Sequence, residues 1–221
     1  MAIAIVALLA FGGSYAYFTA SAGAGTATFT TATLKVTNSG AKLTTISDKV
    51  VPGDKIVGDS GVKFNVTSTA DSYLAVVLTI KKNGSVVNVA DIDDYFNMTA
   101  AKTIGGTEYA AAINTTDWTE CGTTKGVYIK EQTAADAAAD VVFLKNAVVF
   151  AADEHWTNGT MTTPASGDSW EGVSLTFTIS VYQVQKDNLG TGLDSEEAIW
   201  TAMKTALGSN YVADGVAAPQ A

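Results

Sequence analysis

The sequence has very few of the residues that enzyme and metal sites use most often. Its 221 residues include one cysteine and one histidine, so no disulfide can form within the chain, and a zinc site would need carboxylates for most of its ligands. No His-Glu-x-x-His, Gly-x-Ser-x-Gly or Gly-x-x-x-x-Gly-Lys-Ser/Thr pattern occurs, and these are the signatures of metalloproteases, serine hydrolases and P-loop proteins. We therefore expect no enzymatic activity, no catalytic residue, no bound metal and no cofactor.

The few residues that suggest chemistry are scattered. Cys121 is expected to be an unpaired loop residue, because a nucleophilic cysteine needs a histidine and an orienting base beside it. Residues 153–156, Asp-Glu-His-Trp, are the only place where acids meet an imidazole, and we interpret them as a loop or an edge. Asp91, Asp93 and Asp94 lack the spacing of an EF-hand, so they are interpreted as solvated acids around the start of a helix.

Positive charge and proline are also scarce. The 13 Lys and Arg residues against 22 Asp and Glu give a net charge of −9, which argues against a nucleic-acid partner because phosphates require a basic surface. Only 3 prolines accompany 20 glycines, and threonine and valine are abundant. Threonine and valine favour β-strands and glycine favours tight turns, so the composition predicts an all-β protein.

One conspicuous feature that the sequence does contain is an apolar run over residues 2–11. As a helix it would span ~15 Å, about half the hydrocarbon core of a bilayer, which is too short for a stable membrane anchor. Ser14 and Ala16 follow in the small-x-small pattern that a signal peptidase needs. We expect residues 1–16 to resemble a signal peptide that is cleaved after Ala16, and the protein to be secreted to the extracellular space or the cell surface.

Residues 17–28 are small and uncharged, with Tyr17 and Phe18 as the only bulky side chains before the end of the segment. Such a segment cannot form a core alone, but its backbone can pair with the open edge of another subunit. We interpret it as an extended donor strand; the alternative is that it pairs within its own sheet. The expected polymerisation residues are Tyr17, Phe18, Thr19, Ala20, Ala22 and Ala24.

The remaining chain reads as short strands separated by turns. The cleanest alternation of apolar and polar residues covers 173–181 and predicts that Phe177 and Ile179 are core residues. Asn83-Gly84 is a hairpin signal, and residues 141–151 predict a long central strand. Further strands are expected at 26–37, 42–51, 61–68, 73–81, 86–87 and 127–130.

Three short helical segments are expected in the connections and near the C-terminus. They cover residues 91–98, residues 133–140 and a helix that begins at Asp194 or Ser195 and ends at Gly208. Strands in this number with few helices predict a β-sandwich of jelly-roll or Greek-key type. We place the sandwich domain at residues 29–193 and the C-terminal helix and tail at 194–221.

Five Asn-x-Ser/Thr sequons occur, more than chance supplies. Either the protein is a surface glycoprotein, or a threonine-rich chain generates sequons without use. The candidate N-glycosylation sites are Asn65, Asn83, Asn97, Asn114 and Asn158. Four scattered tryptophans are either a carbohydrate platform or, as is more frequent, core and subunit contacts: Trp118, Trp156, Trp170 and Trp200.

Taken in order, several segments resemble the TasA/camelysin family of exported biofilm-matrix and bundling-pilus filament subunits. Residues 12–19, Gly-Gly-Ser-Tyr-Ala-Tyr-Phe-Thr, are similar to the export site of the family, and residues 27–36 to the strand that follows it. Residues 51–55, Val-Pro-Gly-Asp-Lys, look like the family's Pro-Gly-Asp turn. The strand at 175–184 and the helix at 195–200 are similar to its C-terminal end.

The resemblance implies a jelly-roll subunit that is secreted and assembled into extracellular filaments. Donation of the N-terminal segment to the next subunit would make this contact head-to-tail. Its expected partners are identical subunits in a helical filament and neighbouring filaments in bundles. Camelysin relatives have been classed as metalloproteases, but this sequence lacks a metal-binding helix, so the protease activity is not expected here. The alternatives are a monomeric secreted binding module, for instance for carbohydrate, and a secreted protease.

Overall fold

The computed structural model describes residues 34–38, 61–93, 96–104, 107–134, 140–147, 175–208 and 211, together with residues 55, 57, 156–157 and 160–161. Within this part of the chain the strands form antiparallel sheets, and the helices are few. The structure therefore confirms the all-β class that the composition predicts.

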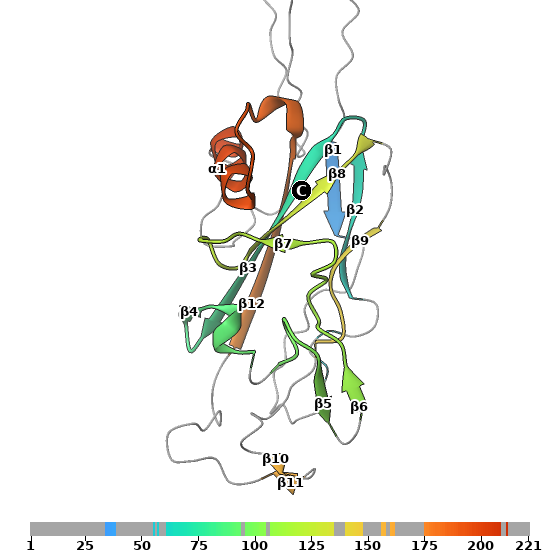
Figure 1. The fold of residues 1–221 in the computed structure, drawn as a ribbon, viewed down its shortest axis with the longest axis vertical. Helices are drawn as coiled ribbons and strands as arrows, with labels where there is room; N and C mark the ends of the chain where they lie inside the picture. The colour runs from blue at the N-terminus through green and yellow to red at the C-terminus, as the bar shows by residue number, and fades with distance from the viewer. Residues whose placement is uncertain are drawn as a thin grey trace, which may run out of the picture.

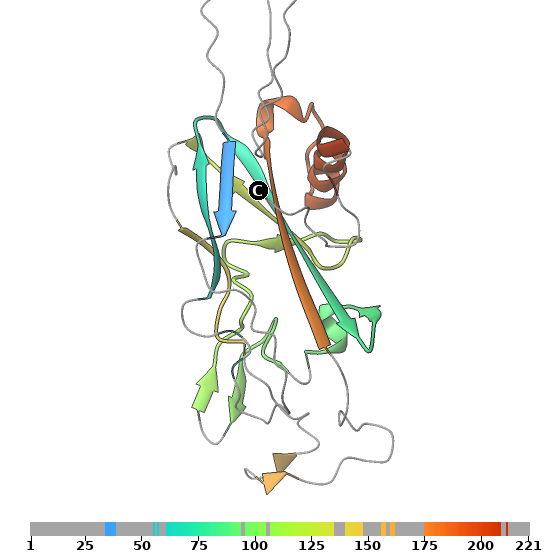
Figure 2. The same ribbon diagram turned by 180° about the vertical axis from the view of Figure 1, so that it is seen from behind.

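Two sheets and one helix form the body of the molecule (Figures 1 and 2). The larger sheet has the order β12-β3-β8-β7, with β4 paired to β3, and the smaller has the order β1-β2-β9. The larger sheet consists of β12 (Leu175–Gln185), β3 (Ser72–Lys82), β8 (Val127–Gln132), β7 (Thr119–Glu120) and β4 (Ser85–Val87). The smaller sheet consists of β1 (Leu34–Asn38), β2 (Val62–Ser68) and β9 (Asp140–Leu144), and the helix α1 covers Glu196–Leu207.

Smaller elements lie in the connections. The 3-10 helices η1 (Val89–Asp91) and η4 (Lys186–Asn188) follow β4 and β12. Two short hairpins pair β5 (Lys102–Ile104) with β6 (Thr107–Tyr109) and β10 (Trp156–Thr157) with β11 (Thr160–Met161).

Strand β3 separates two apolar cores because its alternate side chains point to opposite faces of the sheet. Leu74, Val76, Leu78 and Ile80 belong to the inner core, which lies between the two sheets. Tyr73, Ala75 and Val77 belong to the outer core, which α1 covers. Neighbouring β8 follows the same parity, since Tyr128 lies opposite Val76 and is inner, whereas Val127 and Ile129 are outer.

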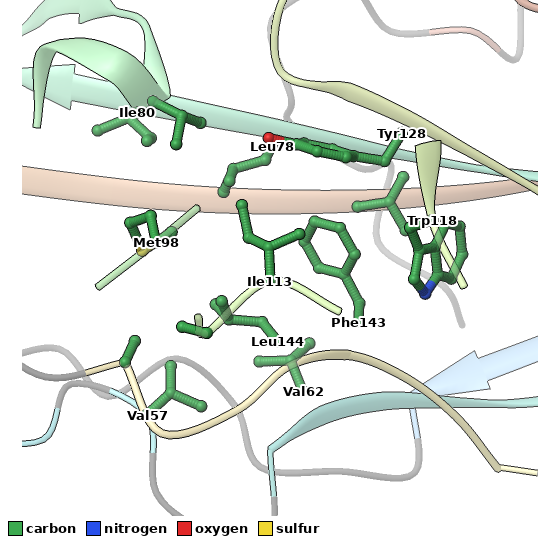
Figure 3. Close-up of a cluster of buried hydrophobic side chains, with 14 of the residues drawn as sticks. Val57, Val62, Leu78, Ile80, Met98, Ile113, Trp118, Tyr128, Phe143 and Leu144 are labelled. Atoms are coloured by element: carbon green, nitrogen blue, oxygen red, sulfur yellow. The ribbon is translucent and has the colours of Figure 1, made fainter. Parts of the chain in front are cut away.

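Aromatic and aliphatic side chains fill the inner core (Figure 3). Trp118 is 1% exposed, and its Nε1 donates a hydrogen bond to the carbonyl of Val142 at 3.0 Å. Its ring meets Phe143 edge to face at a centroid distance of 5.5 Å. Trp118 thus connects the loop before β7 to strand β9 and closes that end of the core.

The C-terminal helix α1 begins and ends where its capping residues predict. The Oγ of Ser195 accepts a hydrogen bond from the backbone N–H of Ala198, and Gly208 has a φ of 54° directly after the last residue of α1. Ile199, Trp200, Met203 and Leu207 are buried against the larger sheet. The apolar stripe of the helix therefore covers the outer core, as its 3.6-residue spacing predicts.

The hairpin at Asn83-Gly84 is also confirmed. Both residues have positive φ, 50° and 83°, as a two-residue type I′ loop requires, and Lys82 pairs with Ser85 on either side. Glycine adopts this backbone conformation without strain, and asparagine tolerates it better than most residues.

Phe177 and Ile179 lie on the predicted strand but are only partly buried. Their side chains pack against the inner core, so the alternation predicted the correct face. Both residues thus contribute to the core, but they are not completely buried, because β12 lies at the end of its sheet and no described strand pairs with its outer side.

The long central strand predicted at 141–151 is wrong in length and position. Strand β9 covers only Asp140–Leu144, and it lies at the end of the β1-β2-β9 order. Asn146 has a φ of 52°, a left-handed conformation that cannot continue a strand. Of the predicted 91–98 helix, only Asp91 is helical among the described residues, which exclude 94 and 95. Asp91 is the last residue of η1 and accepts a hydrogen bond from the N–H of Asn88.

Other predictions fall outside the described residues. These are the strand at 42–51, most of the helical turn at 133–140, and the part of the 26–37 strand before β1.

Candidate intersubunit edge

The larger sheet ends in a long strand that is paired on one side. Strand β12 pairs with β3 without a register break, from Leu175 opposite Lys82 to Gln185 opposite Ser72. Within the described ranges no strand pairs with the other side of β12. Strand β1 runs close to β12 but belongs to the smaller sheet. The outer edge of β12 is therefore the longest unpaired strand edge in the described part of the chain.

The direction of each backbone group on β12 follows from the hydrogen bonds of β3. The N–H of Leu78 donates to the carbonyl of Gly126, on the β8 side, at 2.8 Å. Because backbone groups alternate along a strand, Val77 turns its N–H and C=O toward β12, where it lies opposite Ser180. The residues of β12 that turn their N–H and C=O to the outer edge are then Phe177, Ile179, Val181 and Gln183.

Natural proteins protect such edges with short strands, charged side chains, prolines or bulges. Strand β12, Leu-Thr-Phe-Thr-Ile-Ser-Val-Tyr-Gln-Val-Gln, has 11 residues, no charge, no proline and no register shift. By contrast, the edge strand β1 has five residues and carries Lys35. The outer edge of β12 therefore has the properties of a strand that another strand covers.

The inner face of this edge is apolar and incompletely covered. Phe177, Ile179 and Val181 pack against the inner core and are partly buried. The ring of Phe177 meets Phe96 edge to face at a centroid distance of 5.8 Å. A strand added to β12 would place its own inward side chains beside these three residues, which would extend the inner core.

The residues predicted to polymerise cannot be placed against this edge. Tyr17, Phe18, Thr19, Ala20, Ala22 and Ala24 all lie outside the described residues. Sequence reasoning found β12 as a strand but missed that it is an edge. Its lack of charge and proline over 11 residues was the signal that was available.

Two of the sequon asparagines are used inside the fold. The Nδ2 of Asn97 donates to the carbonyls of Ala110 and Asn146, at 2.6 and 2.9 Å, and the residue is 0% exposed. The folded domain leaves no room for a glycan at Asn97. Asn114 is partly buried and its Nδ2 donates to Asp117 and to the carbonyl of Val142.

The other sequons differ from these. Asn83 is exposed at the tip of the β3–β4 hairpin, where a glycan would extend into solvent. Asn65 is partly buried on β2, and its Nδ2 lies 3.5 Å from Asp140. Asn158 lies outside the described residues.

Cys121 is an unpaired residue in the connection after β7, as expected, and it is buried there. It is 0% exposed in the outer core, and its Sγ lies 3.4 Å from the carbonyl oxygen of Glu196. Burial, together with the nearby carboxylates of Glu197 and Glu196, raises the pKa of the thiol to about 12. The thiolate form that nucleophilic chemistry needs is therefore absent at neutral pH.

The side chains of Asp91 and Asp93 accept hydrogen bonds from backbone groups close to them in the chain. Asp91 accepts from the N–H of Asn88 at 2.8 Å, and Asp93 accepts from the N–H of Thr99 at 2.9 Å. In the part of the chain that the structure describes, no three His, Cys, Asp or Glu residues are grouped to hold a metal ion. Asp94 and residues 153–155 lie outside the described residues.

Two of the four tryptophans are core residues. Trp118 lies in the inner core and Trp200 in the outer core, at 1% and 0% exposure. Trp156 begins β10 and Trp170 lies outside the described residues.

Among the described helices, none combines the length and the hydropathy that crossing a membrane requires. Comparison of the chain with protein-family models, with curated proteins and with solved structures found no match.

Proposed function

We propose that the protein is a structural subunit of an extracellular filament, such as a biofilm-matrix fibre or a bundling pilus. Residues 17–28 of one subunit pair with the outer edge of β12 in the next. The observation that carries the proposal is this edge, which is long, regular, uncharged and without a partner strand in the described part of the molecule. An added strand gains main-chain hydrogen bonds from the outward groups of β12.

Such a contact produces a filament and not a closed dimer. The donor segment and the β12 edge are different surfaces, so the contact is head-to-tail. Each subunit that receives a strand still presents its own N-terminal segment to another subunit. Within this proposal the subunit is a secreted jelly-roll sandwich, and lateral contacts between filaments form bundles.

Two rival interpretations remain to be separated by experiment. In the first, residues 17–28 pair with β12 of their own chain. In the second, the protein is a monomeric secreted binding module. Trp118 and Trp200 give the second interpretation no platform, because both are buried.

The test is a variant that lacks residues 17–25. We expect circular dichroism to show an intact β signal and electron microscopy to show no fibres, because the donor strand is missing and the cores are not. A synthetic peptide of residues 17–28 should bind this truncated subunit and raise its melting temperature, whereas a peptide with the same residues in scrambled order should not.

The outcomes separate the interpretations. Normal fibres from the truncated protein would rule out the donor strand. A lost β signal that the peptide restores would show that the segment pairs with β12 within its own chain. Absence of fibres from the full-length secreted protein would leave the monomeric module.

A further inference from the structure

The inner face of β12 changes character at Gln183. Phe177, Ile179 and Val181 face the apolar inner core. Gln183 lies opposite Leu74 of β3, so its side chain is on the same face, and it is only 8% exposed. Around it the inner face is polar, because Ser72 and Gln132, paired on β3 and β8, are 0% and 2% exposed.

The amide of Gln183 is only half satisfied. Its Nε2 donates to the Oγ of Ser72 at 3.0 Å, whereas its Oε1 has no hydrogen-bond partner although it is buried. Exchanging the amide oxygen and nitrogen would not remove the deficit, because Ser72 can serve only one of them. Buried polar atoms in native proteins are nearly always paired, and a hydrogen-bond donor on an added strand would satisfy this atom.

The incoming group must come from a strand that pairs with β12. Gln183 is one of the residues that turn their N–H and C=O to the outer edge, and a residue opposite it in an added strand would lie roughly 5 Å away with its side chain on the same face. A serine or threonine hydroxyl fits Gln183 best, because a hydroxyl both donates and accepts.

This requirement sets a pattern for the entering strand. Every second residue faces inward, so the residues opposite Phe177, Ile179 and Val181 should be apolar, and the next inward residue should carry a hydroxyl. When residues 17–28 run parallel to β12, one set of alternate residues meets this pattern: Ala20, Ala22, Ala24 and Thr26. Phe18 precedes this set and extends its apolar side. In the opposite direction the only hydroxyl that precedes three residues without polar side chains is Ser21, followed at inward positions by Gly23, Gly25 and Ala27. The two glycines would leave the apolar face uncovered.

We infer that Gln183 sets the register of the subunit contact because its Oε1 accepts a hydrogen bond from the hydroxyl of Thr26 of the neighbouring subunit. This pairing places residues 20–26 parallel to β12. The inference rests on the proposed function and adds to it a register, a direction and a specificity-determining pair. Gln183 discriminates against slipped registers. A slip of two residues in one direction would bring Ala24 to its unpaired amide atom, and a slip in the other direction would bring Thr28 there but would set the hydroxyl of Thr26 against the apolar Val181.

The test is a double-mutant cycle on the critical concentration for fibre formation by the full-length secreted protein. Thr26→Val and Gln183→Leu should each raise that concentration by roughly 5-fold or more, because each leaves one buried polar group unpaired. The double variant should recover most of the loss, because both polar partners are then absent. The side chain of Thr19 would face away from the inner core in this register, so the effect of Thr19→Val should be independent of Gln183→Leu.

A second pair keeps the inference testable if Gln183→Leu does not fold. Thr26→Ser retains the hydroxyl and should assemble like the unmodified protein, whereas Thr26→Val should not. Fibres from all variants at similar concentrations, or additive effects in the cycle, would overturn the register while the filament proposal stands. Absence of fibres from the unmodified protein would overturn both.

Discussion

The two end strands of the larger sheet, β7 and β12, differ in length and in charge. Strand β7 is two residues long and includes Glu120, which accepts the N–H of Gly126 at 3.0 Å and lies 3.5 Å from the Nζ of Lys125. Strand β12 at the other end has 11 residues and no charge. A short, charged edge offers little to a foreign strand, whereas a long neutral one is a template for pairing. This difference between the two edges supports the proposal that a neighbouring subunit adds its strand to β12.

The packing near the two edges should differ as well, and this comparison predicts the largest effect. Trp118, directly before β7, is 1% exposed and hydrogen-bonded, so Trp118→Ala should lower the free energy of unfolding by about 3–5 kcal/mol. Phe177→Ala, on β12, should cost roughly half of that in the isolated subunit, because the ring is only partly buried. Chemical denaturation of both variants measures the two losses.

Equal losses would mean that β12 is already fully covered in the isolated subunit, and the contrast between the edges would disappear. The same measurement on assembled fibres provides the control, because a covering strand should increase the effect of Phe177→Ala and leave that of Trp118→Ala unchanged.

A matched pair of prolines separates the outer edge of β12 from its inner one. The N–H of Val181 points outward, so Val181→Pro removes no hydrogen bond to β3 and should keep the β signal with a modest fall in melting temperature. Ser180 lies opposite Val77 with its backbone groups directed at β3, so Ser180→Pro should disrupt the sheet. Circular dichroism measures whether each variant keeps its β signal, and electron microscopy shows whether it forms fibres.

Only Val181→Pro should give a folded subunit that forms no fibres. If it assembled as well as the unmodified protein, the added strand would have to bind somewhere other than this edge.

The smallest effect concerns the β7 side and depends on pH. Glu197 of α1 accepts hydrogen bonds from the hydroxyl and N–H of Thr124 and from the N–H of Thr123, and these lower its pKa below the usual value of 4.5. Because the folded-state pKa is lowered, the stabilisation is present above pH 4.5 and is lost as the pH falls through the folded-state value. Thermal melts of Glu197→Gln should therefore show less loss of stability below pH 4.5 than melts of the unmodified protein.

The contact lies at the surface, so the shift should be small, and the variant should match the unmodified protein in fibre formation. A change in fibre formation would connect α1 and the β7 turn to assembly and weaken the contrast between the two edges.

Local signals predicted local structure well. Asn83-Gly84 formed its hairpin, Ser195 capped α1, and the alternation around Phe177 predicted the inner face of β12. Each depends on residues only a few positions apart. The same patterns could not tell how far β9 extends, because the conformation of Asn146 ends it, and an apolar run alone does not report backbone dihedrals.

The candidate site was predicted only in part. Alternation reports which face of a strand is buried, but the number of neighbours that a strand has is a property of the whole sheet. The partly buried state of Phe177 and the unpaired amide atom of Gln183 therefore appeared only with the register between β12 and β3.

The sequence by itself determined the class of the protein and its local elements, because strand alternation, turn residues and helix caps act within a few residues. The tertiary structure decided what those elements do. It buried Asn97 against the carbonyl of Asn146 and Cys121 against Glu196, 49 and 75 residues away, and it left β12 with β3 as its only pairing partner among the described strands. Burial and pairing depend on segments that are distant in the chain, and only the packing of those segments against one another brings them together.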